Sequence, residues 1–491
     1  MHSKDSNDVS RRRALTVLGA ASITSLAGCS GDGGGTDTEA GGETAESEGT
    51  NGTNAGSGTT GTPRASISEP ASITLWTNIH GQSQVAEEFM QTQINRFKER
   101  TNNKVNWVKE PVTNVQNGNW LQRMENQQGP TLYQTAFSRM GSFVANNHVT
   151  PWGDVFDQLD DSVVSGTEWA HDTVRNVFRG FEGEKLKMMP LGFVMQEPFV
   201  ARRDHFEEAE LSIEDDFPPT NPEELIDIAT TLKENGPADI GFQVHGSPGD
   251  LMDEISPTWA HGRGGEQGLY VNEAWDDTLL DSDAWKWSLR KQVEIYQDLG
   301  LSAENSAQTS DEDAVRLVID GDASMSQVGM LNYGLFANQA PELLENGTLQ
   351  FAPSWEGESG YRGEFNMNGI AIRSKPSNMD SETWQGKLNA AVNFVNQLAT
   401  VEVQQEVFDN WGLLPFNQTA WEQISTRESG IFEAATTIAE GSEFGWQAHP
   451  DMADIQYNIP GPIFQRAMNG QISAEEACNQ AAKRIRQQVF Q

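Results

Sequence analysis

The fold is decided by residues 72–108, which read SITLWTNIHGQSQVAEEFMQTQINRFKERTNNKVNWV. Residues 73–76 alternate between apolar and polar side chains, which is typical of a strand, and Gly81 then marks a turn. Apolar side chains recur at helical spacing from Val85 to Phe97, and residues 105–108 predict a second strand. Because two strands and a helix follow one another so closely, this stretch predicts a parallel sheet covered by helices.

The same pattern recurs further along the chain. Residues 199–201 predict a strand, a helix is expected to begin after Asn221, and residues 240–244 predict the next strand. A third cycle runs from a helix that begins at Asp311 to a strand over 323–328. The sequence therefore predicts two α/β lobes.

A last helix is expected to begin at Ser473, which precedes Glu476 at capping-box spacing. Cys478 falls on the apolar face of this helix, so we expect a small core residue rather than a reactive thiol.

The charge balance limits the possible partners. The 491 residues contain 71 Asp and Glu but only 33 Lys and Arg, which gives a formal net charge of −38. This excess of negative charge argues against nucleic-acid binding, because a phosphate backbone would be repelled. A carboxylate-rich surface that is poor in Lys favours a protein from a salt-adapted organism, and an ordinary acidic secreted protein is the alternative.

The N-terminal residues predict export and lipid anchoring. Residues 10–29 read SRRRALTVLGAASITSLAGC, in which adjacent arginines precede a short apolar run, as in twin-arginine signal peptides. Residues 26–29 resemble a lipobox, so we expect residues 1–28 to be removed and Cys29 to be lipidated. A plain signal peptide with an incidental cysteine is the alternative.

Residues 29–68 predict a disordered tether between the anchor and the folded body. Gly, Ser, Thr and acidic residues dominate this stretch, which has too few apolar side chains to form a core. Glycosylation sequons occur at Asn51, Asn346 and Asn417.

Six stretches, in order along the chain, resemble segments of family 1 extracellular solute-binding proteins, the sugar-binding subunits of ABC importers. They are residues 73–81 (ITLWTNIHG), 97–108 (FKERTNNKVNWV), 315–325 (VRLVIDGDASM), 369–374 (GIAIRS), 401–415 (VEVQQEVFDNWGLLP) and 472–485 (ISAEEACNQAAKRI). The chain departs from the family pattern at two places. Residues 129–132 read GPTL where Pro-Asp-Val is usual, and Met330 follows Gly329 where the family often has a sugar-stacking Trp.

The resemblance implies an α/β, two-lobed fold of the periplasmic-binding-protein type II-like class. Each lobe is expected to be a mainly parallel sheet flanked by helices, with hinge crossings between the lobes near residues 188–192, 353–360 and 410–416. The expected boundaries are 69–188 and 357–410 for lobe 1, and 189–356 and 411–491 for lobe 2.

The function implied by the resemblance is that of an extracellular substrate-binding subunit. It would capture a small carbohydrate, a mono- or oligosaccharide, in the cleft between the lobes and deliver it to ABC permease subunits served by a separate ATPase. A monomer that is lipid-anchored on the extracellular face of the membrane, without a metal or cofactor, is expected.

Three alternatives stay open at this point. The ligand could be a polyol or a peptide, or the protein could be a tethered sensor that feeds no importer. A secreted glycoside hydrolase is a further alternative, but the chain has no G-x-S-x-G, HExxH or P-loop motif. We therefore predict no enzyme and assign no catalytic residue.

Sugars present apolar C–H faces and a ring of hydroxyl groups, so their sites combine flat aromatic rings with polar and acidic acceptors. Glu197 is nearest to the position where sugar binders of the family often place an acid, and Tyr457 is near an aromatic of their cleft. Each candidate has a plain alternative, which is a core position for a Trp and a solvated surface position for a charged group. The candidate ligand-binding residues are Trp76, His80, Arg139, Glu197, Glu254 (or its neighbour Asp253), Trp259, Trp355, Trp411 and Tyr457.

Overall fold

The computed structural model describes residues 70–78, 84–111, 114–115, 118–152, 187–355, 357–360, 363–441 and 447–491. The chain divides into two units, Met1–Thr62 and Pro63–Gln491, and the structure described below belongs to the second. The predicted signal peptide with Cys29, the tether and His80 lie outside the described residues.

A six-stranded sheet has the order β2-β1-β3-β9-β4, with β5 also paired to β9. Its strands are β1 (Ser72–Thr77), β2 (Lys104–Lys109), β3 (Leu132–Ala136), β4 (Val149–Thr150), β5 (Met189–Gln196) and β9 (Glu364–Arg373). The predicted strand–helix–strand unit is confirmed, because β1 pairs in parallel with β2 and also with β3.

The sheets are mixed, and the expectation of mainly parallel sheets was wrong. β9 runs antiparallel to β3, β4 and β5. The smaller sheet, made of β6 (Phe199–Arg202), β7 (Met325–Gln327) and β8 (Leu349–Ala352), is antiparallel throughout. The chain passes directly from β8 of the smaller sheet into β9 of the larger one. Parallel strands are usually joined by a crossover helix, and the described residues between β8 and β9 contain no such helix.

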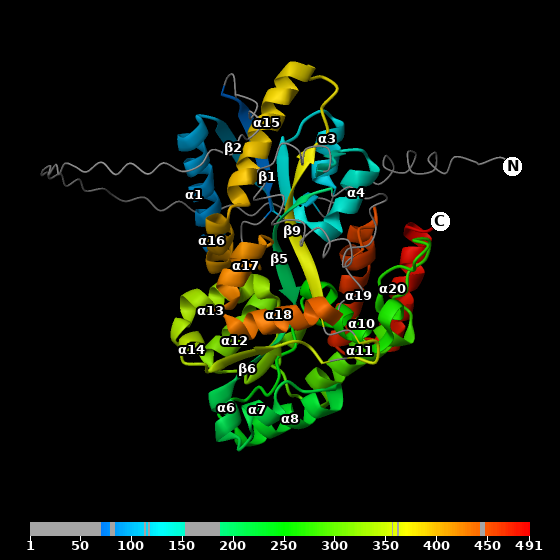
Figure 1. The fold of residues 1–491 in the computed structure, drawn as a ribbon. Helices are drawn as coiled ribbons and strands as arrows, with labels where there is room; N and C mark the ends of the chain where they lie inside the picture. Colours follow the sequence, from blue (N-terminus) through cyan, green and yellow to red (C-terminus); the bar gives the residue numbers. More distant parts are fainter. Residues whose placement is uncertain are drawn as a thin grey trace, which may run out of the picture. The chain divides into compact units, whose positions relative to one another are not determined.

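The long strands β5 and β9 lie side by side and extend from the larger sheet toward the smaller one (Figure 1). Every residue of both strands is buried, so protein covers both faces of this ribbon. At its far end the chain turns from Gln196 through Glu197 into β6, and it returns from β8 into Glu364. The ribbon therefore carries the chain between the two sheets.

Helices cover both sheets. Those that pack with the larger sheet are α1 (Gln84–Thr101), α3 (Asn119–Glu125), α4 (Met140–Ala145), α15 (Ser381–Leu398), α16 (Val401–Trp411), α17 (Gln418–Ser425) and α18 (Ser429–Gly441). The short helix η3 (Phe137–Arg139) leads from β3 into α4.

The remaining helices lie around the smaller sheet. They are α6 (Arg203–Glu208), α7 (Ile213–Asp216), α8 (Pro222–Asn235), α9 (Asp250–Asp253), α10 (Ile255–Gly264), α11 (Asp283–Val293), α12 (Asp311–Asp320), α13 (Tyr333–Gln339), α14 (Pro341–Glu345), η10 (Asp454–Asn458), α19 (Pro460–Met468) and α20 (Ala474–Gln488).

The buried apolar side chains form separate cores. One core contains Ile73 and Ile370 of the larger sheet together with Phe432 of α18. A second contains Phe199 of the smaller sheet and Trp259 of α10, and it continues through α19 and α20. A smaller cluster joins β6 to α12 and α13. The lobe boundaries given above stay a prediction.

Local helix signals in the sequence are confirmed. The side chain of Asn221 accepts a hydrogen bond from the Glu224 amide at 2.9 Å and caps α8, which has Pro222 at its first position. The Ser473 side chain caps α20 in the same way, and Cys478 on that helix is fully buried. The residues predicted as a strand over 240–244 instead form isolated bridges to the segment around β7.

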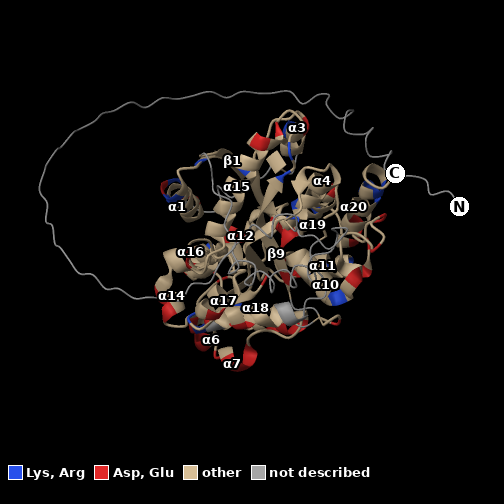
Figure 2. Cartoon of the chain, turned by 45° about the horizontal axis from the view of Figure 1, so that its top comes forward, with Lys and Arg blue, Asp and Glu red and all other residues tan. Residues whose placement is uncertain are grey.

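Helix α7 carries the acidic residues Glu214, Asp215 and Asp216 and no basic residue (Figure 2). Within the described residues, no helix is both long enough and apolar enough to cross a membrane.

Candidate functional site

Three buried carboxyl groups meet at the end of the β5–β9 ribbon, and we call Glu197, Glu254 and Asp311 the inner acid cluster. Glu197 follows β5, Glu254 separates α9 from α10, and Asp311 is the first residue of α12. Gly329, just after β7, faces the cluster. A Cβ atom added there would lie 3.1 Å from both Asp311 Oδ2 and Glu254 Oε2.

The backbone at Glu197 is strained. Its φ of 57° lies in the left-handed region, which is uncommon for residues other than glycine. The next residue is Pro198, which further restricts the conformation of the residue before it. Such strain persists only where the surrounding structure holds it, and here it directs a fully buried carboxyl group toward Glu254.

Burial dominates the electrostatics of the cluster. It raises the pKa of Glu197 well above the usual range, and the negative charges of Asp311, Asp250 and Asp253 add to this effect. Burial also raises the pKa of Glu254, again with a contribution from Glu197. The two glutamate carboxyl groups also act on each other, and two buried groups of like charge side by side favour one shared proton over two ionised carboxylates.

Several polar atoms around this pair lack a hydrogen-bond partner within the described residues. They are both carboxyl oxygens of Glu197, Oε2 of Glu254, Oε1 of Gln196 and both ring nitrogens of His245. Glu197 and His245 are completely buried. Since buried polar groups are nearly always satisfied in folded proteins, this concentration of unsatisfied atoms marks the region as a candidate binding site.

A second polar group adjoins the cluster. The hydroxyl of Tyr457 donates a hydrogen bond of 2.8 Å to Asp253 Oδ1, and the Gln456 amide donates to the same oxygen at 2.9 Å. The Arg139 guanidinium lies 5.8 Å from the centre of the Tyr457 ring. Burial raises the pKa of Asp253 to about 6, although the Arg139 cation lowers it. The amide of Gln196 donates to the Asp253 carbonyl at 3.4 Å and so links this group to the inner acid cluster.

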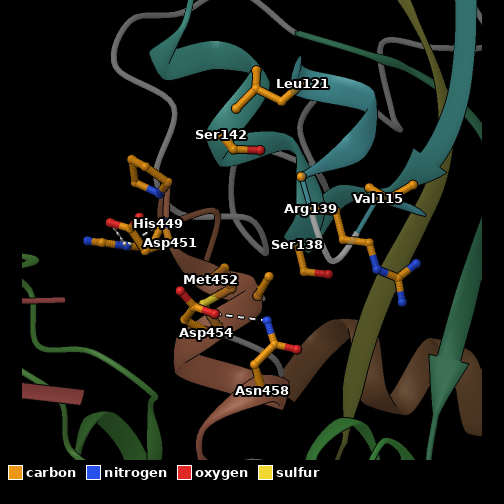
Figure 3. A pocket seen from close by; sticks show the side chains of 13 residues that line it. Val115, Leu121, Ser138, Arg139, Ser142, His449, Asp451, Met452, Asp454 and Asn458 are labelled. Atoms are coloured by element: carbon orange, nitrogen blue, oxygen red, sulfur yellow. Dashed lines mark hydrogen bonds and ion pairs between the residues drawn. The ribbon is translucent and has the colours of Figure 1, made fainter. Parts of the chain in front are cut away.

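Arg139 also lines a cavity of 380 Å³ between two segments that are distant in sequence. One wall consists of Leu121 of α3 and Ser142 of α4, and the other of residues 449–454 and Asn458. Figure 3 shows the Arg139 guanidinium turned away from His449 on the opposite wall. Arg139 therefore separates this cavity from the group around Tyr457.

Paired aromatic rings lie on the other side of the cluster. The ring centres of Trp259 and Trp355 are 4.8 Å apart, and Phe199 packs against Trp355 at 5.6 Å. The indole N–H of Trp259 donates to Gln327 Oε1 at 2.6 Å, and the amide of Gln327 donates to the backbone oxygen of Glu197 at 3.0 Å. The structure thus brings Glu197, Glu254, Trp259 and Trp355 together.

Trp76 and Trp411 are placed in the core of the larger sheet. The Trp76 ring packs against Trp120 at 5.4 Å, and the Arg123 guanidinium stacks on it at 3.8 Å. Trp411 is buried at the end of α16. The burial of both rings fits the alternative of a core position.

Residues that the sequence analysis did not single out complete the site. Gln196, His245 and Asp311 contribute to the inner acid cluster or its rim, and Gln456 supports Asp253. Glu364, where β9 begins, is in contact with His261 of α10. Gln196 and Gln456 adjoin Glu197 and Tyr457 in sequence, whereas nothing in the sequence indicated His245.

The chemistry of this arrangement is that of solute binding. Carboxyl and amide oxygens supply hydrogen-bond acceptors, and buried rings lie beside them. No group of His, Cys, Asp and Glu within the described residues is arranged to hold a metal ion.

Comparison with protein families gives one match. The model of the family described as "Bacterial extracellular solute-binding protein" matches residues 81–405. No curated protein sequence matches the chain.

Solved structures of similar fold cover most of the chain. An ABC transporter solute-binding protein from Agrobacterium radiobacter in complex with ribitol has a TM-score of 0.69 at 15% identity, covering 85% of this chain and 100% of that one. The GacH receptor of Streptomyces glaucescens, solved without ligand and with acarbose, has a TM-score of 0.66 at 16% identity, covering 85% and 98%. Maltose-bound MalE3 of T. maritima has a TM-score of 0.66 at 15% identity, covering 85% and 99%.

Proposed function

Because the chain belongs to the bacterial extracellular solute-binding protein family, we propose that it is the substrate-binding subunit of an ABC importer. It captures a small carbohydrate at the end of the β5–β9 ribbon and delivers it to permease subunits, while a separate ATPase supplies the energy. We further propose that it binds its ligand without turning it over.

The observation that carries this proposal is the concentration of buried, unsatisfied polar atoms around Glu197 and Glu254. A polyhydroxylated ligand would satisfy them with its hydroxyl groups. The ligands of the similar structures, which are ribitol, acarbose and maltose, are polyhydroxylated compounds. Trp259 and Trp355 are themselves buried in the second core, and Trp259 supports the site through Gln327, which bonds to the Glu197 backbone.

The position of the site suits the capture of a ligand by closure. Arg139 approaches it from the larger sheet, whereas Tyr457 and Asp253 belong to segments packed around the smaller sheet. A ligand held between these groups would favour their approach, with the β5–β9 ribbon as the hinge. The lipobox sequence supports a protein that is anchored on the extracellular face of the membrane. We propose that this protein acts as a monomer.

The first test is a thermal-shift screen of the mature protein in molar salt against mono- and disaccharides, polyols and short peptides. A ligand present at 100 times its Kd should stabilise the protein by about 2.7 kcal/mol, which is visible as a raised Tm. A hit with sugars alone would support the proposal, whereas hits with peptides alone would overturn the assigned ligand class.

Tyr457→Phe links binding to the site, because it removes only the hydroxyl group that donates to Asp253. We expect the affinity for a sugar hit to fall at least tenfold in calorimetry. Tyr296→Phe is the matched control, since the Tyr296 hydroxyl donates to the Glu304 backbone on the protein surface. Equal affinities in the two variants would exclude Tyr457 from the site.

A further inference from the structure

We propose that the inner acid cluster receives an ammonium group of the ligand, so that the solute carried by this protein is an amine-bearing one such as an amino sugar. This inference rests on the proposed function, because it names the substrate class of the same site.

The first argument is the charge around the cluster. The charged groups that act most strongly on Glu197 are the carboxyl groups of Asp311, Asp250 and Asp253. The Nε2 atom of His245 is 3.9 Å from Glu197 Oε2, but burial lowers the pKa of His245 to about 4, so this imidazole is neutral at pH 7. Buried carboxylates need a compensating charge. At the centre of the cluster, that charge has to come from a proton or from a ligand.

The second argument concerns neutral acceptors beside the acids. Gln196 is only 2% exposed, and its amide nitrogen is held by the Asp253 carbonyl. Its Oε1 has no partner among the described residues and lies 3.4 Å from the position that a Cβ of Gly329 would occupy. Glu254 Oε2 points to the same position. An amide oxygen and a neutral imidazole, both buried and unsatisfied, are acceptors that await a donor.

The third argument is the match between donors and acceptors. A primary ammonium group has three N–H donors and no acceptor. Glu197, Glu254 and Gln196 each present at least one unsatisfied oxygen to the cluster. A single sugar hydroxyl brings only one donor together with its own lone pairs, so several hydroxyl groups would be needed where one ammonium group suffices. Hydrogen bonds between ionised groups are also the stronger kind.

Binding then involves a balanced exchange of charge. Because two buried carboxyl groups of like charge cannot both ionise without a compensating charge, the Glu197–Glu254 pair of the free protein would hold one proton. When the ammonium group enters, this proton leaves for solvent, and the net charge of the cluster is unchanged. A neutral sugar would leave the proton in place, because it brings no charge that could replace it.

The experiment is titration calorimetry of the mature protein at pH 7 in molar NaCl, carried out in two buffers of different ionisation enthalpy. The probes are glucosamine and its β-1,4-linked dimer, the N-acetylated form of each, glucose, spermidine and KCl. We expect the amino sugars to bind at least tenfold more tightly than their N-acetylated forms and to release about one proton per ligand bound.

Site variants locate the effect. Glu197→Gln and Glu254→Gln keep the shape of the side chains, and each should abolish proton release and most of the preference for the amine. Glu223→Gln is the matched control, because it removes the same charge from a side chain of α8 that is 70% exposed. Proton release by the unaltered protein tests the inference even if a cluster variant fails to fold.

Other outcomes separate the two proposals. If glucose or an N-acetylated sugar binds as tightly as the amino sugars and without proton release, the inference is wrong and the sugar-binding function stands. If spermidine alone binds and releases the proton, the ammonium site stands and the carbohydrate assignment falls. Binding of none of these probes by folded protein overturns the inference. It is also overturned if KCl displaces the proton, because a free inorganic cation then occupies the cluster.

Discussion

At the scale of single residues, Asp253 is one group whose ionisation affects stability on the acid side of neutral pH. Burial raises its pKa from 3.8 to about 6. Between these values the folded state binds more protons than the unfolded state, so the free energy of unfolding falls as the pH rises through this window. At pH 7 the buried charge costs about 3 kcal/mol relative to an unperturbed carboxyl group.

We therefore predict that Asp253→Asn flattens the dependence of stability on pH. The amide keeps an oxygen that can accept the hydrogen bond from Tyr457, but it cannot ionise. The free energy of unfolding of the variant should exceed that of the unaltered protein by an amount that grows between pH 4 and pH 7. Urea unfolding at a series of pH values measures this difference. A parallel shift of the whole profile would contradict the assignment, and Glu223→Gln provides the reference for removal of an exposed charge.

At the scale of elements, α4 is pressed against the segment that follows α18. A Cβ atom at Gly141 of α4 would lie 2.2 Å from the Ala448 carbonyl oxygen and 2.4 Å from that of His449. Only glycine allows this approach, which joins the two walls of the 380 Å³ cavity. In contrast, a Cβ atom added at Gly386 of α15 would have no atom from another part of the described chain within 4 Å.

These two helical glycines give opposite predictions. Gly141→Ala should destabilise the protein by about 1–3 kcal/mol, because backbone atoms of residues 448–449 must move. Gly386→Ala should stabilise it by about 0.5–1 kcal/mol through the higher helix propensity of alanine. Chemical denaturation measures both changes. Equal effects at the two positions would show that the contact at Gly141 is not tight in solution.

The sequence predicted elements better than it predicted the site. Strand–helix–strand units and the caps at Asn221 and Ser473 are local, so spacing along the chain reveals them. The antiparallel course of β9 and the convergence of Glu197, Glu254 and Asp311 depend on which distant segments meet. Composition could not single out these three acids, because 71 Asp and Glu residues are spread along the chain. The sequence around Trp76 and Trp355 did not show which of the two lies near the acids, although they belong to different cores.

At the scale of the whole molecule, the proposed lipid anchor determines where the protein acts. We predict that Cys29→Ser releases it from the membrane fraction into the medium, because the thiol that would carry the lipid is absent. Immunoblotting of fractionated cells measures this distribution. Cys478→Ala is the control, since this thiol is buried in the second core and should leave the protein on the membrane. Membrane association of the Cys29 variant would disprove the lipobox assignment.

The central position of β9 also determines the order in which the molecule can fold. β9 is hydrogen-bonded to β3, β4 and β5, and Gln134 and Asn368 in this sheet bond to each other although they are 234 residues apart. A nascent chain therefore cannot complete its N-terminal sheet until β9 has left the ribosome. Such long-range pairing slows folding and leaves strand edges open for longer. Export in the folded state would thus have to follow synthesis of at least the first 373 of the 491 residues.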